Sequence, residues 1–401
     1  MRKGKKMLPD YYEFQHSTKL LSGKFALENI PAELQMLGAR RPMVLSDHVL
    51  SEIGTLSLVC DAVQENGIAI GAVFHEIPAD SSSAVVNEIG ELYRKSGCDS
   101  LVAVGGGSVL DTAKGVRMLL SQKADDIMEL LGCEILTRGR HVPFVAIPTT
   151  SGTGSESTLV AVIRNAKNSM KMEFISYYLQ PDVTVLDARM TLTLPARMTA
   201  STGLDALCHA IEACTCLQKN PISHAYGTAA IRMIGECLER AAKNGRDEEA
   251  RLAMANASTM AGAAFSNSMV GMVHAIGHAL GGVCHVPHAD AMTILLPHCM
   301  EYNMDMLSDD YGELLLYLAG PEEYAAVRAD ERGAAMVKKV RELTNRLHDL
   351  CGLPRTLKEA KVKKEDFEAV AEAALNDGAM IVNPKQVDLQ DVIAILERAY
   401  E

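Results

Sequence analysis

Two short segments of the chain concentrate histidine together with a carboxylate. Asp205 and His209 are four residues apart in a stretch with helical character, so their side chains project from the same face. That spacing suits two ligands of one metal ion. Further on, His274 and His278 lie one helical turn apart. The same region then continues with His285, His288 and Asp290.

Five of the twelve histidines therefore fall in two apolar segments. A single histidine on an apolar helix is more often a core group with a satisfied ring than a ligand. Five of them, buried together with a carboxylate, would leave many ring nitrogens without partners unless a metal or a proton-transfer role used them. The pattern favours a metal site. Imidazole with carboxylate suits Fe, Zn, Co, Ni or Mn, and the order of affinities does not choose among them.

A glycine turn follows one of the apolar runs. Residues 100–104 read as a strand, Gly105, Gly106, Gly107 and Ser108 follow at once, and residues 109–120 have helical character. Glycines let the backbone approach a ligand, and the amides at a helix start attract phosphate. A tight turn without a ligand would look similar, and the segment is not the Gly-x-Gly-x-x-Gly fingerprint of dinucleotide-binding folds.

A second polar turn strengthens the interpretation as a cofactor crevice. The apolar run 142–147 ends in a segment with Thr149 and Thr150, rich in hydroxyls and glycines. Two such loops at the carboxyl ends of strands predict a cofactor site. Asp47 follows the run 42–46, where a carboxylate could hold an adenosine ribose and repel a 2′-phosphate, favouring NAD over NADP. Equally, Ser46 or Asp47 could simply cap the next helix.

The elements that carry these motifs fall into two halves. Runs 42–46, 69–74, 100–104, 142–147 and 183–186 read as buried strands of a parallel α/β sheet. From about Pro195 the pattern becomes helical, as in 196–216, 225–243 and 249–266. We therefore expect a Rossmann-like dinucleotide-binding domain over 1–194 and an all-helical metal-binding domain over 195–401.

Bulk composition restricts the possible partners. The chain has 401 residues, 48% of them hydrophobic, and a formal charge of −12 that opposes binding to nucleic acid or an anionic membrane. No apolar run approaches the roughly 18 to 20 residues of a membrane span, and no export signal is visible. Ten cysteines without paired spacing read as reduced thiols, which predicts a cytoplasmic protein. The charged stretch Lys243–Arg251 reads as a solvated connection between helices.

Three motifs together resemble the iron-containing (group III) alcohol dehydrogenase family. They are the segments 105–114, 148–156 and 274–282, followed by Pro287-His288 and Leu296-Pro297. The resemblance extends over roughly residues 11–400 and implies the two-domain architecture of the dehydroquinate synthase group. It also implies homo-oligomers, small alcohol or aldehyde substrates, an NAD(P) cofactor and Fe(II), with Zn(II) as the alternative. The carboxylate of Asp47 makes NAD the expected cofactor, with NADP less favoured.

The resemblance also assigns roles to individual residues. It implies that the metal ligands are Asp205, His209, His274 and His288, and that His278 lies beside the substrate and takes part in proton transfer. The cofactor contacts that it implies are Asp47, Gly105, Gly106, Gly107, Ser108, Thr149, Thr150 and Lys171, the last as a lysine that follows a hairpin. One departure is Ala289, where many members of the family have glycine. Its methyl group would narrow the substrate pocket.

The expected chemistry is hydride transfer between a nicotinamide and a small primary alcohol, diol or aldehyde whose oxygen binds the metal. We expect the reaction in the cleft between the two domains, with closure excluding water. One alternative is a metal- and NAD-dependent polyol dehydrogenase or lyase of the dehydroquinate synthase and glycerol dehydrogenase group. A non-haem iron oxygenase using His288 and Asp290, or a helical metal-storage module, are further alternatives that leave the fold or the two loops unexplained.

Overall fold

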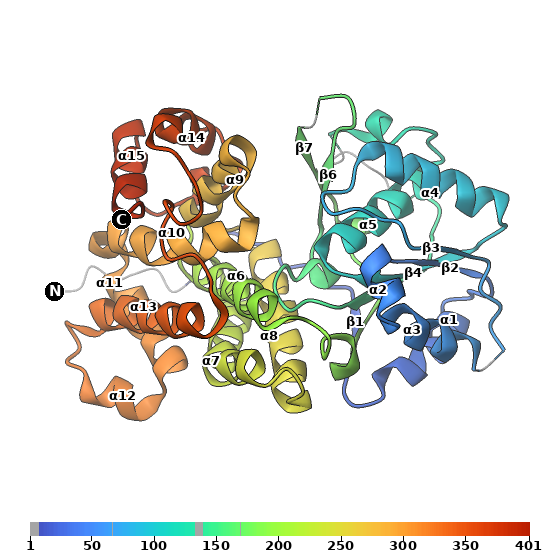
Figure 1. Cartoon of the computed structure of the whole chain (residues 1–401), viewed down its shortest axis with the longest axis horizontal. Coiled ribbons are helices and arrows are strands. Elements are labelled where there is room, and N and C mark those ends of the chain that lie inside the picture. Colours follow the sequence, from blue (N-terminus) through green and yellow to red (C-terminus); the bar gives the residue numbers. More distant parts are fainter. Residues whose placement is uncertain (1–7, 66, 133–138, 169) are drawn as a thin grey trace. The chain divides into compact units, whose positions relative to one another are not determined.

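The structure is a computed structural model that describes residues 8–65, 67–132, 139–168 and 170–401. Its contacts divide the chain into two compact units (Figure 1). Among the described residues, one unit is formed by Gln15–Thr193, and the other by Leu194–Glu401 together with residues 8–14. Among the described residues, none of the helices is both long and apolar enough to cross a membrane.

The first unit is built on a parallel sheet of six strands in the order β1-β8-β5-β4-β2-β3. Every neighbouring pair is parallel, so all six carboxyl ends lie at one edge. This confirms the predicted α/β fold class. The strands are β1 (Lys19–Ser22), β2 (Pro42–Leu45), β3 (Ala72–Phe74), β4 (Ser100–Gly105), β5 (Phe144–Pro148) and β8 (Val183–Leu186).

Helices cover both faces of this sheet, and successive side chains of β4 point alternately into the two cores that the helices form with the sheet. Leu101 and Ala103 belong to the core beneath α4 and α5, whereas Val102 and Val104 belong to the core beneath α1 and α3 (Figure 1). A strand buried on both faces favours apolar residues toward each face, which is why these runs are largely continuous rather than alternating. The helices are α1 (Ile30–Met36), α2 (His48–Glu52), α3 (Thr55–Gln64), α4 (Ser83–Lys95) and α5 (Gly107–Gln122).

One strand of this unit was not predicted, whereas the hairpin that the family resemblance implied is present. The edge strand β1 is short and largely exposed, so its sequence lacks the apolar run of a central strand. A separate antiparallel hairpin of β6 (Val160–Arg164) and β7 (Lys171–Ile175) follows the second polar turn. Its β6 strand packs against α5.

The second unit is helical, as expected, and is organised around α6. This helix is buried almost throughout from Thr199 to Thr215, and it packs against α7, α8 and α10. Its burial explains the density of Ala, Leu and Cys along it. The helices of the unit are α6 (Ala196–Thr215), α7 (Pro221–Lys243), α8 (Glu248–Ser266), α9 (Met272–Cys284), α10 (His288–Tyr302), α11 (Met304–Ala319), α12 (Pro321–Ala326), α13 (Arg332–Cys351), α14 (Phe367–Leu375) and α15 (Leu389–Arg398).

The charged stretch between α7 and α8 is only partly the solvated connection that we predicted. Arg251 is 2% exposed, because α8 turns it inward. Its guanidinium donates to the carbonyl of Gly245 at 3.0 Å, the hydroxyl of Thr199 at 2.6 Å and the carbonyl of Leu194 at 2.9 Å. These bonds satisfy the buried charge and hold the start of α6 against α8.

The packing of α6 against α7 depends on a glycine. A methyl group at Gly227 would lie 2.5 Å from Cys214 Sγ and 3.0 Å from the carbonyl oxygen of Ala210, both on α6. The first distance is shorter than a side-chain carbon tolerates and the second is unusually tight, so the two helices approach closely at this position because it has no side chain.

Gly227→Ala should therefore lower the free energy of unfolding of the helical unit by about 1–3 kcal/mol, since overpacking forces the helices apart. Chemical denaturation followed by circular dichroism measures the change. Gly282→Ala on α9 is the matched control. No atom lies within 4 Å of the added methyl there, so the same measurement should show a gain of roughly 0.5–1 kcal/mol. Equal effects of the two substitutions would contradict this account of the contact.

Candidate active site

Three helices of the second unit bring the four expected metal ligands together. Asp205 and His209 lie on α6, His274 lies in the first turn of α9, and His288 is the first residue of α10. The helices α9 and α10 pack against each other, and α10 also packs on α6. Positions 83 residues apart in sequence thereby converge.

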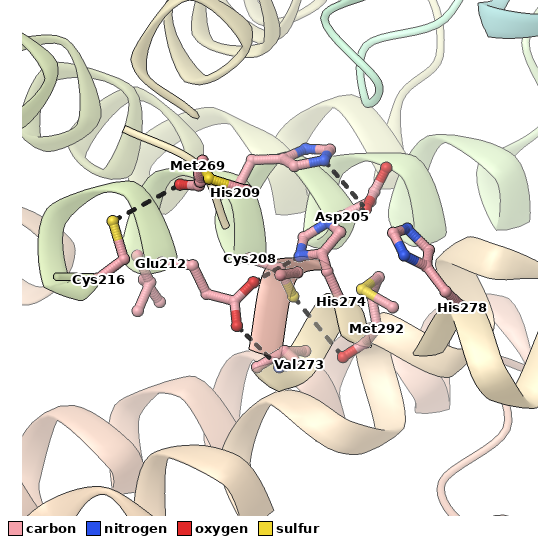
Figure 2. Close-up of polar contacts among 12 residues, drawn as sticks. Asp205, Cys208, His209, Glu212, Cys216, Met269, Val273, His274, His278 and Met292 are labelled. Carbon is pink, nitrogen blue, oxygen red and sulfur yellow. Dashed lines mark hydrogen bonds and ion pairs between the residues drawn. The ribbon is translucent and has the colours of Figure 1, made fainter. Parts of the chain in front are cut away.

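The carboxylate of Asp205 is the centre of this group. Its Oδ1 lies 3.5 Å from His288 Nε2, 3.8 Å from His274 Nε2 and 3.9 Å from His209 Nε2. Figure 2 shows the rings of His209 and His274 next to the carboxylate of Asp205. Tetrahedral ligands about 2.0–2.2 Å from one ion lie about 3.5 Å apart, so these separations match the edges of a metal coordination shell.

Burial and charge give the group the donor states that a cation needs. Burial on its own raises the pKa of Asp205, but the three neighbouring histidines hold it well below its usual range. Burial lowers the pKa of His209 to about 3 and holds the pKa of His274 well below the ordinary value. The group therefore combines one carboxylate with imidazoles that keep their lone pairs.

Two atoms at the centre also lack partners. Asp205 Oδ1 and His274 Nε2 are buried, and neither makes a hydrogen bond to any part of the chain that the structure describes. Leaving such polar atoms unsatisfied costs free energy. A divalent cation held by Asp205, His209, His274 and His288 would satisfy both, so the residues present fit a metal of the Fe(II) or Zn(II) type.

Glu212 is a buried neighbour of this group that we did not predict. Its Oε2 lies 2.5 Å from His274 Nδ1, and its Oε1 accepts the backbone N–H of Val273 at 2.8 Å (Figure 2). Burial raises the pKa of Glu212 to about 7, although backbone N–H groups at the start of α9 oppose that shift. Its position, three residues after His209 on α6, was the available signal, because it shares the helix face of the ligands.

His278 lies beside the ligands and has a carboxylate partner of its own. Its ring is 5.4 Å from that of His288 and 5.9 Å from that of His274, and its Nδ1 lies 2.8 Å from Asp377 Oδ2. Burial on its own raises the pKa of Asp377, but the hydrogen bond and the charge of His278 bring it below the usual value. Asp377 is 99 residues away along the chain, and no local pattern marked it.

Other residues of these segments lie apart from the cluster. Asp290 pairs with Arg197 at 2.8 Å, so its carboxylate is engaged away from the imidazoles that an oxygenase triad would require. His285 ends α9 as an exposed residue with φ 58°. Ala289 follows His288 in the first turn of α10, where its carbonyl accepts the hydroxyl of Thr293 at 2.8 Å.

The glycine turn and the hydroxyl turn lie side by side in the first unit. Their strands β4 and β5 are parallel neighbours, with Gly105 paired to Pro148, and Thr149 N–H donates to the carbonyl of Gly105 at 3.1 Å. A methyl group at Gly106 would lie 3.3 Å from Thr150 Cγ2. The loops thus form one continuous surface at the carboxyl edge of the sheet, and no side chain of the described residues caps the start of α5. Helix amides remain directed at this surface.

Two charged residues on α5 tie the hydroxyl turn to the glycine helix. Asp111 accepts the hydroxyl of Ser155 at 2.6 Å and the N–H of Val162 at 3.0 Å. Lys114, which is fully buried, donates to the hydroxyl of Thr158 and the carbonyl of Val160, both at 2.7 Å. Burial lowers the pKa of Lys114 to about 8. We did not predict either role, although the spacing of three residues places both on one helix face.

The remaining cofactor candidates lie at the same edge but differ in what they contact. Asp47 caps α2, since its Oδ1 accepts the N–H of Leu50 at 2.9 Å, which leaves its second oxygen for another donor. The hydroxyl of Ser108 accepts the N–H of Asp80 at 3.3 Å, and Lys171 pairs with the carboxylate of Asp80 at 2.8 Å. Lys171 is the first residue of β7, so it lies within the hairpin and not after it, as we had placed it.

Comparison with known proteins extends over both units. Residues 17–188 match the description "Iron-containing alcohol dehydrogenase", and residues 199–400 match "Fe-containing alcohol dehydrogenase family, C-terminal". The NAD-dependent methanol dehydrogenase of Bacillus methanolicus is 33% identical over 377 residues, covering 94% of this chain and 97% of the relative.

Two further relatives agree. The 1,3-propanediol dehydrogenase of Klebsiella pneumoniae is 33% identical, covering 94% of this chain and 96% of its own length. The solved structure of an alcohol dehydrogenase from Oenococcus oeni superimposes with a TM-score of 0.91 at 31% identity, covering 97% of this chain and all of that one. The chain belongs to the iron-containing alcohol dehydrogenase family.

Proposed function

We propose that this protein interconverts a small primary alcohol or diol and its aldehyde, with Asp205, His209, His274 and His288 as the ligands of an Fe(II) ion. Family membership makes the chain a metal-dependent, NAD-linked alcohol dehydrogenase or aldehyde reductase. The observation that supports the ligand assignment is the buried Asp205 Oδ1, without a hydrogen-bond partner among the described residues and within 3.9 Å of three imidazole nitrogens. Zn(II) is the alternative ion, since the same donors accept it.

The bound metal would supply Lewis-acid polarisation of the reacting oxygen, and the nicotinamide would exchange the hydride. The residues of the chain prepare this chemistry. Asp205 offsets the charge of the cation, and the three imidazoles fix its position. We assign to His278 Nε2 the exchange of a proton with the substrate hydroxyl, because Asp377 engages the opposite ring nitrogen. Asp377 acts through His278 as a positioning residue.

For the cofactor we assign the pyrophosphate to the loop of Gly105, Gly106, Gly107 and Ser108, with Thr149 and Thr150 as hydroxyl donors from the neighbouring turn. The open helix start and the close approach of the two loops support this assignment. The second oxygen of Asp47 would accept the adenosine ribose, and its charge favours NAD over NADP. Lys171 would contribute positive charge at the same edge once its pairing with Asp80 loosens.

We also propose that the protein is a cytoplasmic homo-oligomer. All nine cysteines that the structure describes are free thiols, which suits a reducing compartment. The edge strand β1 is largely exposed, with Leu20 at 40%, and an uncovered edge with an apolar side chain favours pairing with another copy. Light scattering coupled to size-exclusion chromatography tests the assembly, and a monomer at micromolar concentration would contradict it.

The decisive experiment is anaerobic NADH oxidation by chelator-stripped protein, restored with Fe(II) or Zn(II), against a panel of short aldehydes that includes 3-hydroxypropanal. We expect no turnover without metal and more turnover with Fe(II) than with Zn(II). Tight NADH binding with no turnover on any aldehyde would move the assignment toward the polyol dehydrogenase or lyase alternative.

His274→Ala should abolish turnover, with a loss of at least about 10²-fold, because the metal loses a ligand at the centre of the cluster. Metal analysis of the purified variant should show less than one ion per chain. Fluorescence titration should give an NADH dissociation constant within a factor of two of the parent value, because the cofactor loops lie in the other unit. Turnover retained by a variant with a measured metal deficit would refute the ligand assignment.

Asp111→Ala should weaken NADH binding by about tenfold, or roughly 1.4 kcal/mol. The substitution removes the acceptors of Ser155 and Val162, so the hydroxyl turn is no longer tied to the glycine helix. Glu91→Gln on the exposed face of α4 is the control, since that carboxylate pairs only at the surface with Lys95. If Asp111→Ala bound NADH as tightly as the control, the tie would have no part in cofactor binding.

A further inference from the structure

We propose that Glu212 is a positioning residue that locks His274 in the tautomer able to bind the metal. The inference rests on the proposed function, because it assumes that His274 Nε2 is a ligand atom. It concerns a residue outside the proposed ligand set, and it is carried by the contacts of one buried side chain.

The carboxylate of Glu212 is held in one orientation. Gly271 precedes α9, and a methyl group at that position would lie 3.0 Å from Glu212 Oε1. This close approach lets Oε1 accept the N–H of Val273 at 2.8 Å, so Glu212, although it belongs to α6, caps the start of α9. With Oε1 engaged by a backbone donor, only Oε2 remains for the ring of His274.

The contact with the ring then determines where the imidazole proton lies. Oε2 is 2.5 Å from His274 Nδ1, and a carboxylate oxygen accepts a proton from a ring N–H. A neutral imidazole carries only one ring proton. Placing it on Nδ1 leaves Nε2 with a lone pair, and Nε2 is the buried atom without a hydrogen-bond partner among the described residues that lies 3.8 Å from Asp205 Oδ1.

The substitution Glu212→Gln tests the tautomer assignment, because it reverses the hydrogen bond to His274 Nδ1 and keeps the one from the N–H of Val273. The amide oxygen should stay on the N–H of Val273, since an NH₂ group there would face another donor. The amide NH₂ then faces His274 Nδ1, which must accept. The ring proton moves to Nε2, and that atom can no longer bind a cation without giving up the new hydrogen bond.

We therefore expect Glu212→Gln to weaken Zn(II) or Co(II) binding by about 10- to 100-fold, the usual range for a partner that orients a ligating histidine. Chelator competition on the metal-free protein measures the affinity. The unfolding midpoint of the metal-free variant should stay close to that of the parent, because the cap on α9 is retained. Long-range ¹H–¹⁵N spectra of histidine-labelled, metal-free protein should show the His274 proton on Nδ1 in the parent and on Nε2 in the variant.

Glu212→Ala separates this role from a purely structural one. It removes both the cap and the ring contact, so its unfolding midpoint should fall below that of Glu212→Gln. Positioning of the tautomer requires that Glu212→Gln lose at least as much metal affinity as Glu212→Ala despite its greater stability. If instead metal affinity follows stability, with Glu212→Gln within twofold of the parent, the proposal is overturned.

Asp377→Asn is the matched control, because Asp377 contacts His278, the neighbouring histidine on α9. His278 also directs Nδ1 toward a carboxylate, but it is not a proposed ligand, so Asp377→Asn should leave the metal dissociation constant within a factor of two. A loss of metal affinity equal to that of Glu212→Gln would overturn the assignment to Glu212. Failure of the parent protein to bind any metal would refute the proposed ligand set instead, while the tautomer spectra still test the contact itself.

Discussion

The stability of the helical unit depends on how it accommodates the buried carboxylate of Asp205. Asp205 lies at 1% exposure in the middle of α6, surrounded by apolar side chains and three imidazoles. An isolated anion in such surroundings is strongly destabilised, and neutral rings offset only part of that cost. The arrangement becomes stable when a cation completes it. For that reason the same residues that weaken the unfilled core provide the driving force for metal binding.

This constraint also explains how the ligands are held. Asp205, His209 and Glu212 follow one another along α6 at spacings of four and three, so one rigid helix presents two proposed ligands and the carboxylate that contacts a third. The start of α9 is fixed on Glu212, and Phe265 of α8 stacks on the ring of His209 at 4.3 Å. The geometry of the cluster is therefore determined by helix packing and not by loops, which suits a site that needs fixed ligand distances.

Local sequence patterns predicted those parts of the molecule that depend on local interactions. The apolar runs predicted five of the six strands of the sheet, because the central strands are buried on both faces and are therefore mostly apolar. One of the five, β3, is not the buried strand that we expected: it is an edge strand with Val73 41% exposed. The spacing of Asp205 and His209 correctly placed them on one helix face. The edge strand β1 was missed because its exposure removes that signal. Asp377 and Asp80 were missed because their contacts with His278 and Lys171 are made only by the fold. Arg251 was assigned to solvent because charge alone does not reveal three buried acceptors.

The first unit also contains a buried charged side chain, Lys114, but its charge is satisfied within the chain. The side chain of Lys114 is 0% exposed. Its ammonium group donates hydrogen bonds to the hydroxyl of Thr158 and the carbonyl of Val160, and Asp111 lies 3.9 Å away. Every one of these acceptors belongs to α5 or to the segment that follows the hydroxyl turn. Because the charge is satisfied from within the chain, it requires no ligand and serves only to tie two segments together. Asp205 lacks such internal partners for its Oδ1 among the described residues. Both groups are buried and charged, so they differ mainly in their hydrogen bonds. A buried charge with partners inside the chain stabilises a loop, whereas a buried carboxylate oxygen without such partners favours binding of a cation.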